Sequence, residues 1–381
     1  MIRTYSFPIL LVSLLFVAIS LSALNTQTPL WLVDANVAMW QIGMVGTSYF
    51  IGNLVGTLIA NWFISKINVK QTYTCVCLLF AFATLGMGLS VNVVCWSFFR
   101  FLIGIACAVT WIIVESSILV TSKANNRSKM IAIYMTTYYL GSVLGLKLLH
   151  YFPKSILYFA LVIVVLMALA ILFILFTHYH LPSRKTRVFN ILPMIKFQPA
   201  RLGLVGCIIS GMVIGAIYSL LPAYYYQLGF TDDEVSNWII LVIASGLIAQ
   251  MPIGFFANKY GTSSVLIVET LLFTVACFMI INNYWLIFAT IVVGATIFTV
   301  YPLSMSWACS TVDKSNIVLM NQTMLLVNTI GCLIAPAIIS LFMDKWGNNF
   351  LFICFMGIAI YFMIILMVKR NNHSQFSVHS K

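Results

Sequence analysis

Charge is what this 381-residue chain has least of, since only 7% of its residues are Asp, Glu, Lys or Arg. A soluble globular domain carries about 25%. Hydrophobic residues make up 62% of the chain, and the mean hydropathy is +1.04. A chain of this composition has too little polar surface to face water, so the sequence predicts an integral membrane protein.

Motifs of the common enzyme classes are also missing. The sequence contains no glycine-rich phosphate-binding loop with its lysine, no H-E-x-x-H pair and no G-x-S-x-G elbow. Its nine cysteines form no C-x-x-C pair, and the apolar segments hold too few acids for a metal cluster. We therefore expect no enzyme activity, no cofactor and no metal, and we interpret the cysteines as small apolar packing residues.

Long apolar segments occupy most of the chain. A membrane-spanning helix needs about 20 such residues, and the first segment follows Arg3 without a signal-peptide cleavage site, which predicts a first spanning helix. Twelve segments are predicted: 7–28, 41–64, 72–91, 95–119, 131–149, 155–177, 203–227, 236–257, 264–282, 286–309, 318–342 and 350–368. The fold class is thus an all-α membrane protein with twelve transmembrane helices in two pseudo-symmetric six-helix bundles. The bundles are 1–177 and 202–381, joined by a basic linker, 178–201.

The basic residues lie mainly in short connections between the apolar segments. Sixteen of the twenty fall on the side that holds both termini and the linker, and three fall at the opposite side. Cytoplasmic loops of membrane proteins carry such an excess of Lys and Arg. We therefore expect both termini to be cytoplasmic, and we assign the net charge of +12 to membrane topology rather than to nucleic-acid binding.

Two stretches half a chain apart share a pattern. Residues 52–68 and 245–261 each run from an apolar helix with small residues into a short basic turn, so that Lys66 corresponds to Lys259 and Phe63 to Phe256. Two halves built alike are typical of transporters that rock about a midplane site. Three G-x-x-x-G pairs (52/56, 141/145 and 211/215) predict close helix packing, and Pro29, Pro222, Pro252, Pro302 and Pro336 fall within or at the ends of spans.

The twelve helices, the basic central loop and the paired turns resemble the major facilitator superfamily over the whole chain. Arg100-Phe-Leu-Ile-Gly104 is similar to that family's fourth-helix motif. Further strings resemble its YcaD-type group: 24–32 (LNTQTPLWL), 48–57 (SYFIGNLVGT), 114–116 (VES), 206–211 (GCIISG), Tyr301-Pro302, 307–309 (WAC) and 320–322 (MNQ). The resemblance implies a transporter of the bacterial inner membrane. Where the family's loop motif has an acid, this chain has Ser65 and Asn258.

Ionisable residues inside spans are rare and costly, so they are the strongest functional candidates. Arg100 lies about 7.5 Å into the fourth helix, and Glu115 lies roughly 22 Å further along it, too far for an ion pair. Arg100 therefore needs polar partners, an acid from another helix or an anionic substrate, unless it only fixes helix packing. The resemblance links this arginine to coupling or to the charge of the substrate cavity. Lys147 can reach the membrane surface, and we assign it no role.

Two acids of the spans, Glu115 and Glu269, are candidates for proton transfer or gating. Glu115 either carries a proton as its surroundings alternate between wet and closed, or forms a cytoplasmic gate with Lys66 or Arg127, or is a passive structural acid. Glu269 is expected to form an interfacial ion pair with Lys259. Together the cytoplasmic gate is predicted to comprise Ser65, Lys66, Asn258, Lys259 and Glu269.

Neutral polar side chains complete the candidates for a substrate or coupling site. In lipid they either bond between helices or line a water-filled path. They are Asn25, Gln27, Asn53, Tyr138, Tyr139, Tyr218, Tyr301, Asn321, Gln322 and Asn328, to be considered with Arg100 and Glu115.

The function predicted from these features is secondary active transport of a small solute by alternating access, coupled to protons. A non-transporting receptor or assembly factor on the same fold is the alternative, and a membrane-embedded enzyme is disfavoured by the missing motifs. We expect a monomer in the bilayer whose partners are a small-molecule substrate and protons, with no nucleic acid.

Overall fold

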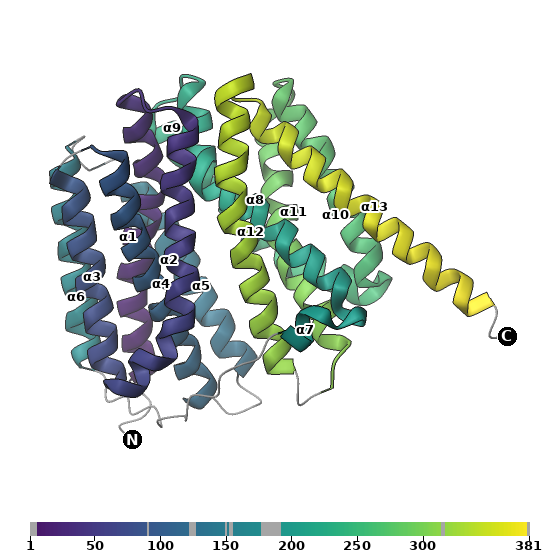
Figure 1. The fold of residues 1–381 in the computed structure, drawn as a ribbon, viewed down its shortest axis with the longest axis horizontal. Coiled ribbons are helices and arrows are strands. Elements are labelled where there is room, and N and C mark those ends of the chain that lie inside the picture. Colours follow the sequence, from purple (N-terminus) through teal and green to yellow (C-terminus); the bar gives the residue numbers. More distant parts are fainter. Residues whose placement is uncertain are drawn as a thin grey trace. The chain divides into compact units, whose positions relative to one another are not determined.

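The computed structural model describes residues 6–89, 91–121, 127–148, 151, 155–176, 192–313 and 317–378. Twelve helices of 20 or more residues account for nearly all of this part of the chain, which contains no strand (Figure 1). At 1.5 Å per residue, even the shortest is about 30 Å long, the thickness of a hydrocarbon core. The all-α fold predicted from the sequence is therefore confirmed.

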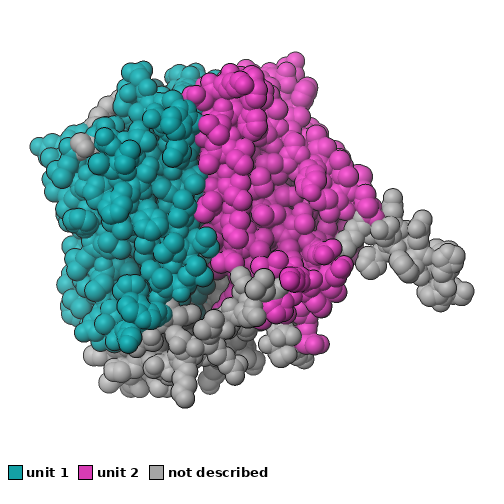
Figure 2. Space-filling model, in the orientation of Figure 1, with its two compact units in different colours: residues 1–188, 225–237 teal, residues 189–224, 238–381 magenta. Residues whose placement is uncertain are grey.

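The structure divides into two compact units, which are described separately. Unit 1 comprises residues 1–188 and 225–237, and unit 2 comprises residues 189–224 and 238–381 (Figure 2). The long helices of unit 1 are α1 (Ser6–Asp34), α2 (Met39–Lys66), α3 (Val69–Leu89), α4 (Val93–Thr121), α5 (Arg127–Leu148) and α6 (Ile156–Leu175). The others are α8 (Arg201–Gln227), α9 (Asp232–Tyr260), α10 (Thr262–Ile281), α11 (Leu286–Ser310), α12 (Ile317–Trp346) and α13 (Phe350–Val378). The first residues of α9 and the last of α8 belong to unit 1.

Eleven of these twelve helices are long and apolar enough to cross a membrane. The exception within the described residues is α5, the predicted fifth span, which is 22 residues long. The side chains of α5 are described without a break only over residues 133–148, a stretch shorter than a span. Its length of roughly 33 Å still suits a span.

Small residues set the packing within unit 1. A Cβ atom on Gly52 would lie 1.9 Å from the carbonyl oxygen of Phe101, and one on Gly104 would lie 2.0 Å from that of Tyr49. The backbones of α2 and α4 therefore pack directly against each other, with one glycine from each helix at the contact. Gly141 and Gly145 bring α5 onto α1 in the same way, where a Cβ atom on Gly145 would meet the Ile19 carbonyl at 2.3 Å. These contacts confirm two of the predicted G-x-x-x-G interfaces.

Unit 2 contains the same kind of close helix contact at glycines. A Cβ atom on Gly211 would lie 2.0 Å from the Asn328 carbonyl oxygen, and Gly215 faces Cys332, so α8 packs on α12. Gly294 of α11 faces the Val242 carbonyl of α9 at 2.2 Å. The third predicted pair is confirmed, and each unit contains the same two kinds of close helix contact. The five prolines lie inside α1, α8, α9, α11 and α12.

Two helices, α3 and α9, begin with hydrogen bonds between a side chain and a backbone amide. After Lys66, the last residue of α2, the Asn68 side chain accepts a hydrogen bond from the Gln71 amide at 2.9 Å and so begins α3. Glu234 accepts one from the Thr231 amide at 2.8 Å at the start of α9. Both are capping boxes, which satisfy amides that have no partner in the first helical turn.

The predicted linker is partly helical. Leu192–Lys196 form the short helix α7, and Gln198–Ala200 form a 3₁₀ turn that leads into α8 at Arg201. Met194 and Ala200 of these elements bury apolar surface against α12 and its neighbours. Residues 177–191, which hold Arg184, Lys185 and Arg187, lie outside the described residues, as do Arg3, Lys123, Lys154, Lys314 and Lys381.

Candidate substrate and coupling site

Arg100 is a buried cation in the interior of unit 1. The close contact between α2 and α4 brings its side chain against Tyr49, and only 4% of its surface is exposed. Its Nη2 donates a hydrogen bond to Asn25 Oδ1 of α1 at 2.7 Å, and its guanidinium carbon lies 4.8 Å from the centre of the Tyr49 ring. Three helices, α1, α2 and α4, therefore hold one positive charge.

The remaining donors of Arg100 are not satisfied by the described part of the protein. Its Nε and Nη1 atoms are buried and have no hydrogen-bond partner there. A buried donor without a partner costs about 1–3 kcal/mol, and more when it is charged. The arrangement is thus poised to bind an acceptor, and a carboxylate, phosphate or carbonyl oxygen would suit the planar guanidinium.

Glu115 occupies a different environment further along α4. It is partly buried, and its Oε1 accepts a hydrogen bond from the hydroxyl of Tyr134 on α5 at 3.5 Å. Lys66, a gate partner considered for it, ends α2 with an exposed side chain and makes no contact with it. The side chain of Arg127, the other candidate partner, lies outside the described residues. Since the phenol is neutral, Glu115 has no cationic partner among the described side chains.

Aromatic rings lie beside Glu115. Trp111, one turn earlier on α4, packs edge-on against Tyr138 with ring centres 5.0 Å apart, and Tyr138 lies 5.4 Å from Tyr139. Arg100 and Trp111 are three turns apart and so share one face of α4. Tyr138 and Tyr139 therefore lie against the face of α4 that carries Arg100 and Trp111, while Tyr134 is the partner of Glu115.

The other polar candidates of unit 1 differ in how far they are buried. Asn25 is the partner of Arg100, as described above. Gln27 is 8% exposed, one half-turn further along α1. Asn53 is half-buried on α2, and its carbonyl accepts a hydrogen bond from the Thr57 hydroxyl at 2.9 Å.

In unit 2, one candidate bonds between helices. Asn328 Nδ2 of α12 donates to the Cys207 carbonyl of α8 at 3.0 Å, so this residue fixes the α8–α12 contact. Gln322, on the same helix, has a buried Oε1 without a partner among the described residues. Tyr218 lies 6.3 Å from Phe298, centre to centre, and Tyr301 packs against the apolar cluster around Cys207 and Met324. The Asn321 side chain lies outside the described residues.

The predicted gate residues do not form the pairs expected of them. Lys259 lies with its Nζ 5.1 Å from the ring centre of Tyr260, and Asn258 is exposed. Glu269 is 3% exposed, and its Oε1 forms a hydrogen bond with the hydroxyl of Thr299 on α11. The expected Lys259–Glu269 ion pair is therefore wrong, because Glu269 faces the interior of unit 2. The Ser65 side chain lies outside the described residues.

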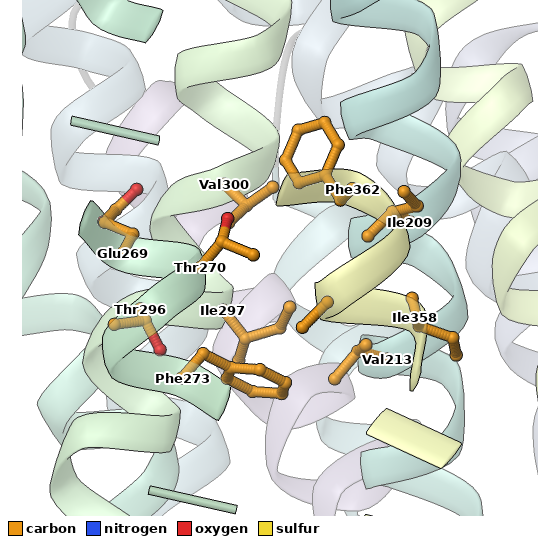
Figure 3. A pocket seen from close by; sticks show the side chains of 11 residues that line it. Ile209, Val213, Glu269, Thr270, Phe273, Thr296, Ile297, Val300, Ile358 and Phe362 are labelled. Atoms are coloured by element: carbon orange, nitrogen blue, oxygen red, sulfur yellow. The ribbon is translucent and has the colours of Figure 1, made fainter. Parts of the chain in front are cut away.

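A small cavity adjoins Glu269 in unit 2. It has a volume of about 20 Å³. Figure 3 shows Glu269, Thr270 and Thr296 on one side of it and Ile209, Val213 and Ile358 on the other. Its full lining is Ile209, Val213, Glu269, Thr270, Phe273, Thr296, Ile297, Val300, Ile358, Ala359 and Phe362.

Four partners of the candidate residues were missed from the sequence: Tyr49, Trp111, Tyr134 and Thr299. Tyr49 is 51 residues from Arg100, and Thr299 is 30 residues from Glu269, so only the helix packing brings them together. Tyr49 lies within the string 48–57 that carries the family resemblance, which was a usable signal. Trp111 could have been found from its position one turn before Glu115.

Comparison with known proteins identifies the family. The sequence model of the Major Facilitator Superfamily matches residues 10–248 and 203–378. The chain belongs to the major facilitator superfamily. A Yersinia pestis "Uncharacterized MFS-type transporter" is 40% identical over 374 residues, which cover 97% of this chain and 98% of that protein. The YcaD transporter of Salmonella heidelberg is 36% identical over 371 residues, with 97% of each chain covered.

Solved structures of major facilitator transporters have the same fold. The nucleoside transporter NupG superposes with a TM-score of 0.77, covering 96% of this chain and 99% of NupG at 15% identity. The human organic anion transporter MFSD10 superposes with a TM-score of 0.68, covering 96% and 99% at 14% identity. By its family, this chain is a multi-pass membrane protein and a secondary transporter. The resemblance to the YcaD-type group is confirmed by the relatives.

Proposed function

We propose that this chain moves a small solute by alternating access, driven by a proton gradient, and that its substrate binds at Arg100. The observation that carries the proposal is the geometry of this guanidinium. Its Nη2 donates a hydrogen bond to Asn25, and its planar face lies over the Tyr49 ring. The buried Nε and Nη1 have no partner among the described residues and are left for a ligand.

The chemistry of the site favours a substrate with an anionic or strongly accepting oxygen. A buried guanidinium whose Nε and Nη1 have no partner among the described residues suits an anionic oxygen such as that of a carboxylate or phosphate. The Tyr49 ring and the neighbouring apolar helix surfaces would suit an attached ring or hydrocarbon.

Glu115 is the proposed proton carrier of unit 1. It is partly buried, bonds to the neutral Tyr134 hydroxyl and has no cationic partner among the described residues. An unpaired carboxyl in a span is stable when neutral, and it can lose its proton when water reaches it. The alternative role, a cytoplasmic gate, would pair Glu115 with Lys66 or Arg127; of these, Lys66 is exposed at the end of α2.

The proposed topology places both termini, the linker and the turns at Lys66 and Lys259 in the cytoplasm, in a bacterial inner membrane. The excess of basic residues on this side supports it. We expect the monomer to be the working unit.

The experiment that tests the proposal is solute flux into proteoliposomes that contain the purified protein, with an imposed pH gradient. Wild type should move at least one small organic anion, and Arg100→Ala should need about a 10- to 100-fold higher concentration of that anion for the same flux. The matched control is Lys345→Ala, because Lys345 lies over Trp346 at the same 4.8 Å as Arg100 over Tyr49 but on an exposed turn. A receptor or assembly factor would give no flux in any sample.

A further inference from the structure

Glu269 is a carboxyl buried inside unit 2, far from either end of its helix. It is the eighth of the 20 residues of α10, about 10 Å from the helix start, and is 3% exposed. Its Oε1 contacts Thr299 Oγ1 of α11, and its Oε2 is buried without a partner among the described residues. Nothing in the proposed transport at Arg100 and Glu115 uses this residue.

No cation balances Glu269 within the part of the chain that lines the cavity. α8 contributes Ile209 and Val213, and α13 contributes Ile358, Ala359 and Phe362. α11 contributes Thr296, Ile297 and Val300, and α10 adds only Thr270 and Phe273 beside Glu269. None of these side chains is titratable, so the carboxyl is the one ionisable group of the lining. A carboxylate in such surroundings is far less stable than the neutral acid.

The hydrogen bonds of Thr299 also favour the neutral acid. Its Oγ1 lies 3.0 Å from the Ala295 carbonyl and 2.7 Å from the Thr296 carbonyl, in addition to Glu269. A threonine hydroxyl has one proton to donate, and carbonyl oxygens only accept. If Thr299 donates to Thr296, the contact with Glu269 requires a proton on the carboxyl. Protonated Glu269 then donates to Thr299, and all three groups are satisfied.

The adjoining cavity offers a place for proton exchange. Its volume of about 20 Å³ is enough for one water molecule, since a water needs roughly 10–15 Å³ in this measure. Glu269 and the hydroxyl-bearing side chains of Thr270 and Thr296 lie on one side of it (Figure 3). A water there would reach polar groups on one side and apolar surface on the other.

We propose that Glu269 is a proton-binding site in the interior of unit 2, positioned by Thr299 and exchanging its proton with water in the adjoining cavity. On release, the carboxyl O–H bond breaks, the proton passes to a water molecule, and the carboxylate that remains accepts a hydrogen bond from Thr299. This site is separate from Glu115 in unit 1, and it does not depend on the identity of the substrate.

Infrared difference spectroscopy on the full chain in lipid nanodiscs tests the proposal. A Glu115→Gln background removes the other candidate carboxyl of the spans. In this background at neutral pH, the spectrum should contain the C=O band of a protonated carboxyl, and Glu269→Gln should abolish it. Asp313→Asn, which changes an exposed acid of the same unit, should leave the band in place.

A second variant keeps the test decisive if Glu269→Gln does not fold. Thr299→Val removes the hydroxyl with little change in shape, and it should shift the frequency of the same band. An unshifted band in Thr299→Val, or an unchanged spectrum in folded Glu269→Gln, would overturn the proposal. So would a carboxylate at neutral pH whose band responds to sodium, because Glu269 would then be part of a metal-cation site.

Discussion

Arg100 Nη2 and Asn25 Oδ1 are 2.7 Å apart, and this bond links α1 to α4 beside the Tyr49 ring. The pair orients a buried guanidinium with two of its donors unused by the described residues. A residue that served packing alone would be expected to satisfy all its donors. The site therefore has the features of a binding group held ready for an acceptor.

Replacing Arg100 by Ala should weaken the apparent affinity for an anionic substrate about 10- to 100-fold, because charged hydrogen bonds contribute roughly 1.5–3 kcal/mol. Arg100→Lys should recover only part of this, since a lysine lacks the planar pair of donors. Concentration dependence of uptake measures the effect. Equal affinity in wild type and Arg100→Ala would exclude Arg100 as a substrate ligand.

Asn25→Ala should have a smaller effect of the same kind. It removes the acceptor that orients Arg100 but leaves the charge, so we expect about a 5- to 10-fold loss of affinity, corresponding to roughly 1 kcal/mol. Asn237→Ala is the matched control, as it removes an asparagine of unit 1 that accepts a hydrogen bond from a different cation, Lys147, at 2.8 Å. An Asn237 effect as large as that of Asn25 would argue against the orienting bond.

Replacing Glu115 by Gln should abolish proton-driven transport and spare exchange of substrate between the two sides. The amide keeps the shape and the contact with Tyr134 but cannot carry a proton. Driven uptake and counterflow are measured in the same proteoliposomes. If driven transport persists in Glu115→Gln, Glu115 is not the proton carrier.

The close contact of α2 and α4 should not tolerate a side chain at Gly52. A Cβ atom on Gly52 would lie 1.9 Å from a backbone oxygen, so Gly52→Ala should force the helices apart and cost about 1–3 kcal/mol of stability. The control is Gly254→Ala in α9, where nothing lies within 4 Å of the added atom. Thermal unfolding in detergent should show a lower Tm for Gly52→Ala alone. Equal midpoints would refute the packing argument.

The proposed topology can be tested with single cysteines at Lys66 and Lys345, in a background without the exposed Cys75 and Cys95. An impermeant maleimide applied to whole cells should label Lys345→Cys and not Lys66→Cys. Both lysines are exposed, so accessibility in the folded protein does not limit the reaction. The reverse pattern would invert the orientation.

Much of the fold could be predicted from the sequence, because a bilayer demands long apolar helices and leaves small residues to set their contacts. Gly52, Gly141 and Gly211 were therefore interpretable as interfaces before any coordinates. The short helix α7 could not be predicted in the same way. A segment of five residues is too short to show a helical periodicity of apolar side chains, and α7 is buried only through packing against other helices.

The candidate site was predictable only in part. Arg100 and Glu115 stood out as rare charges in apolar surroundings, but their partners Asn25, Tyr49 and Tyr134 come from other helices. Glu269 shows the limit most clearly. Its distance from Lys259 along the chain suggested an ion pair, whereas the rotation of α10 directs the carboxyl to Thr299 inside unit 2.

Transport by the purified wild-type protein tests the central claim most directly. Proteoliposomes with an imposed pH gradient are supplied with a panel of small metabolites and drugs rich in organic anions. We predict that at least one solute accumulates against its own gradient, that a protonophore abolishes this, and that Arg100→Ala liposomes accumulate far less of it at low substrate concentration. Flux that is absent across the whole panel, or that is identical in Arg100→Ala, would contradict the account.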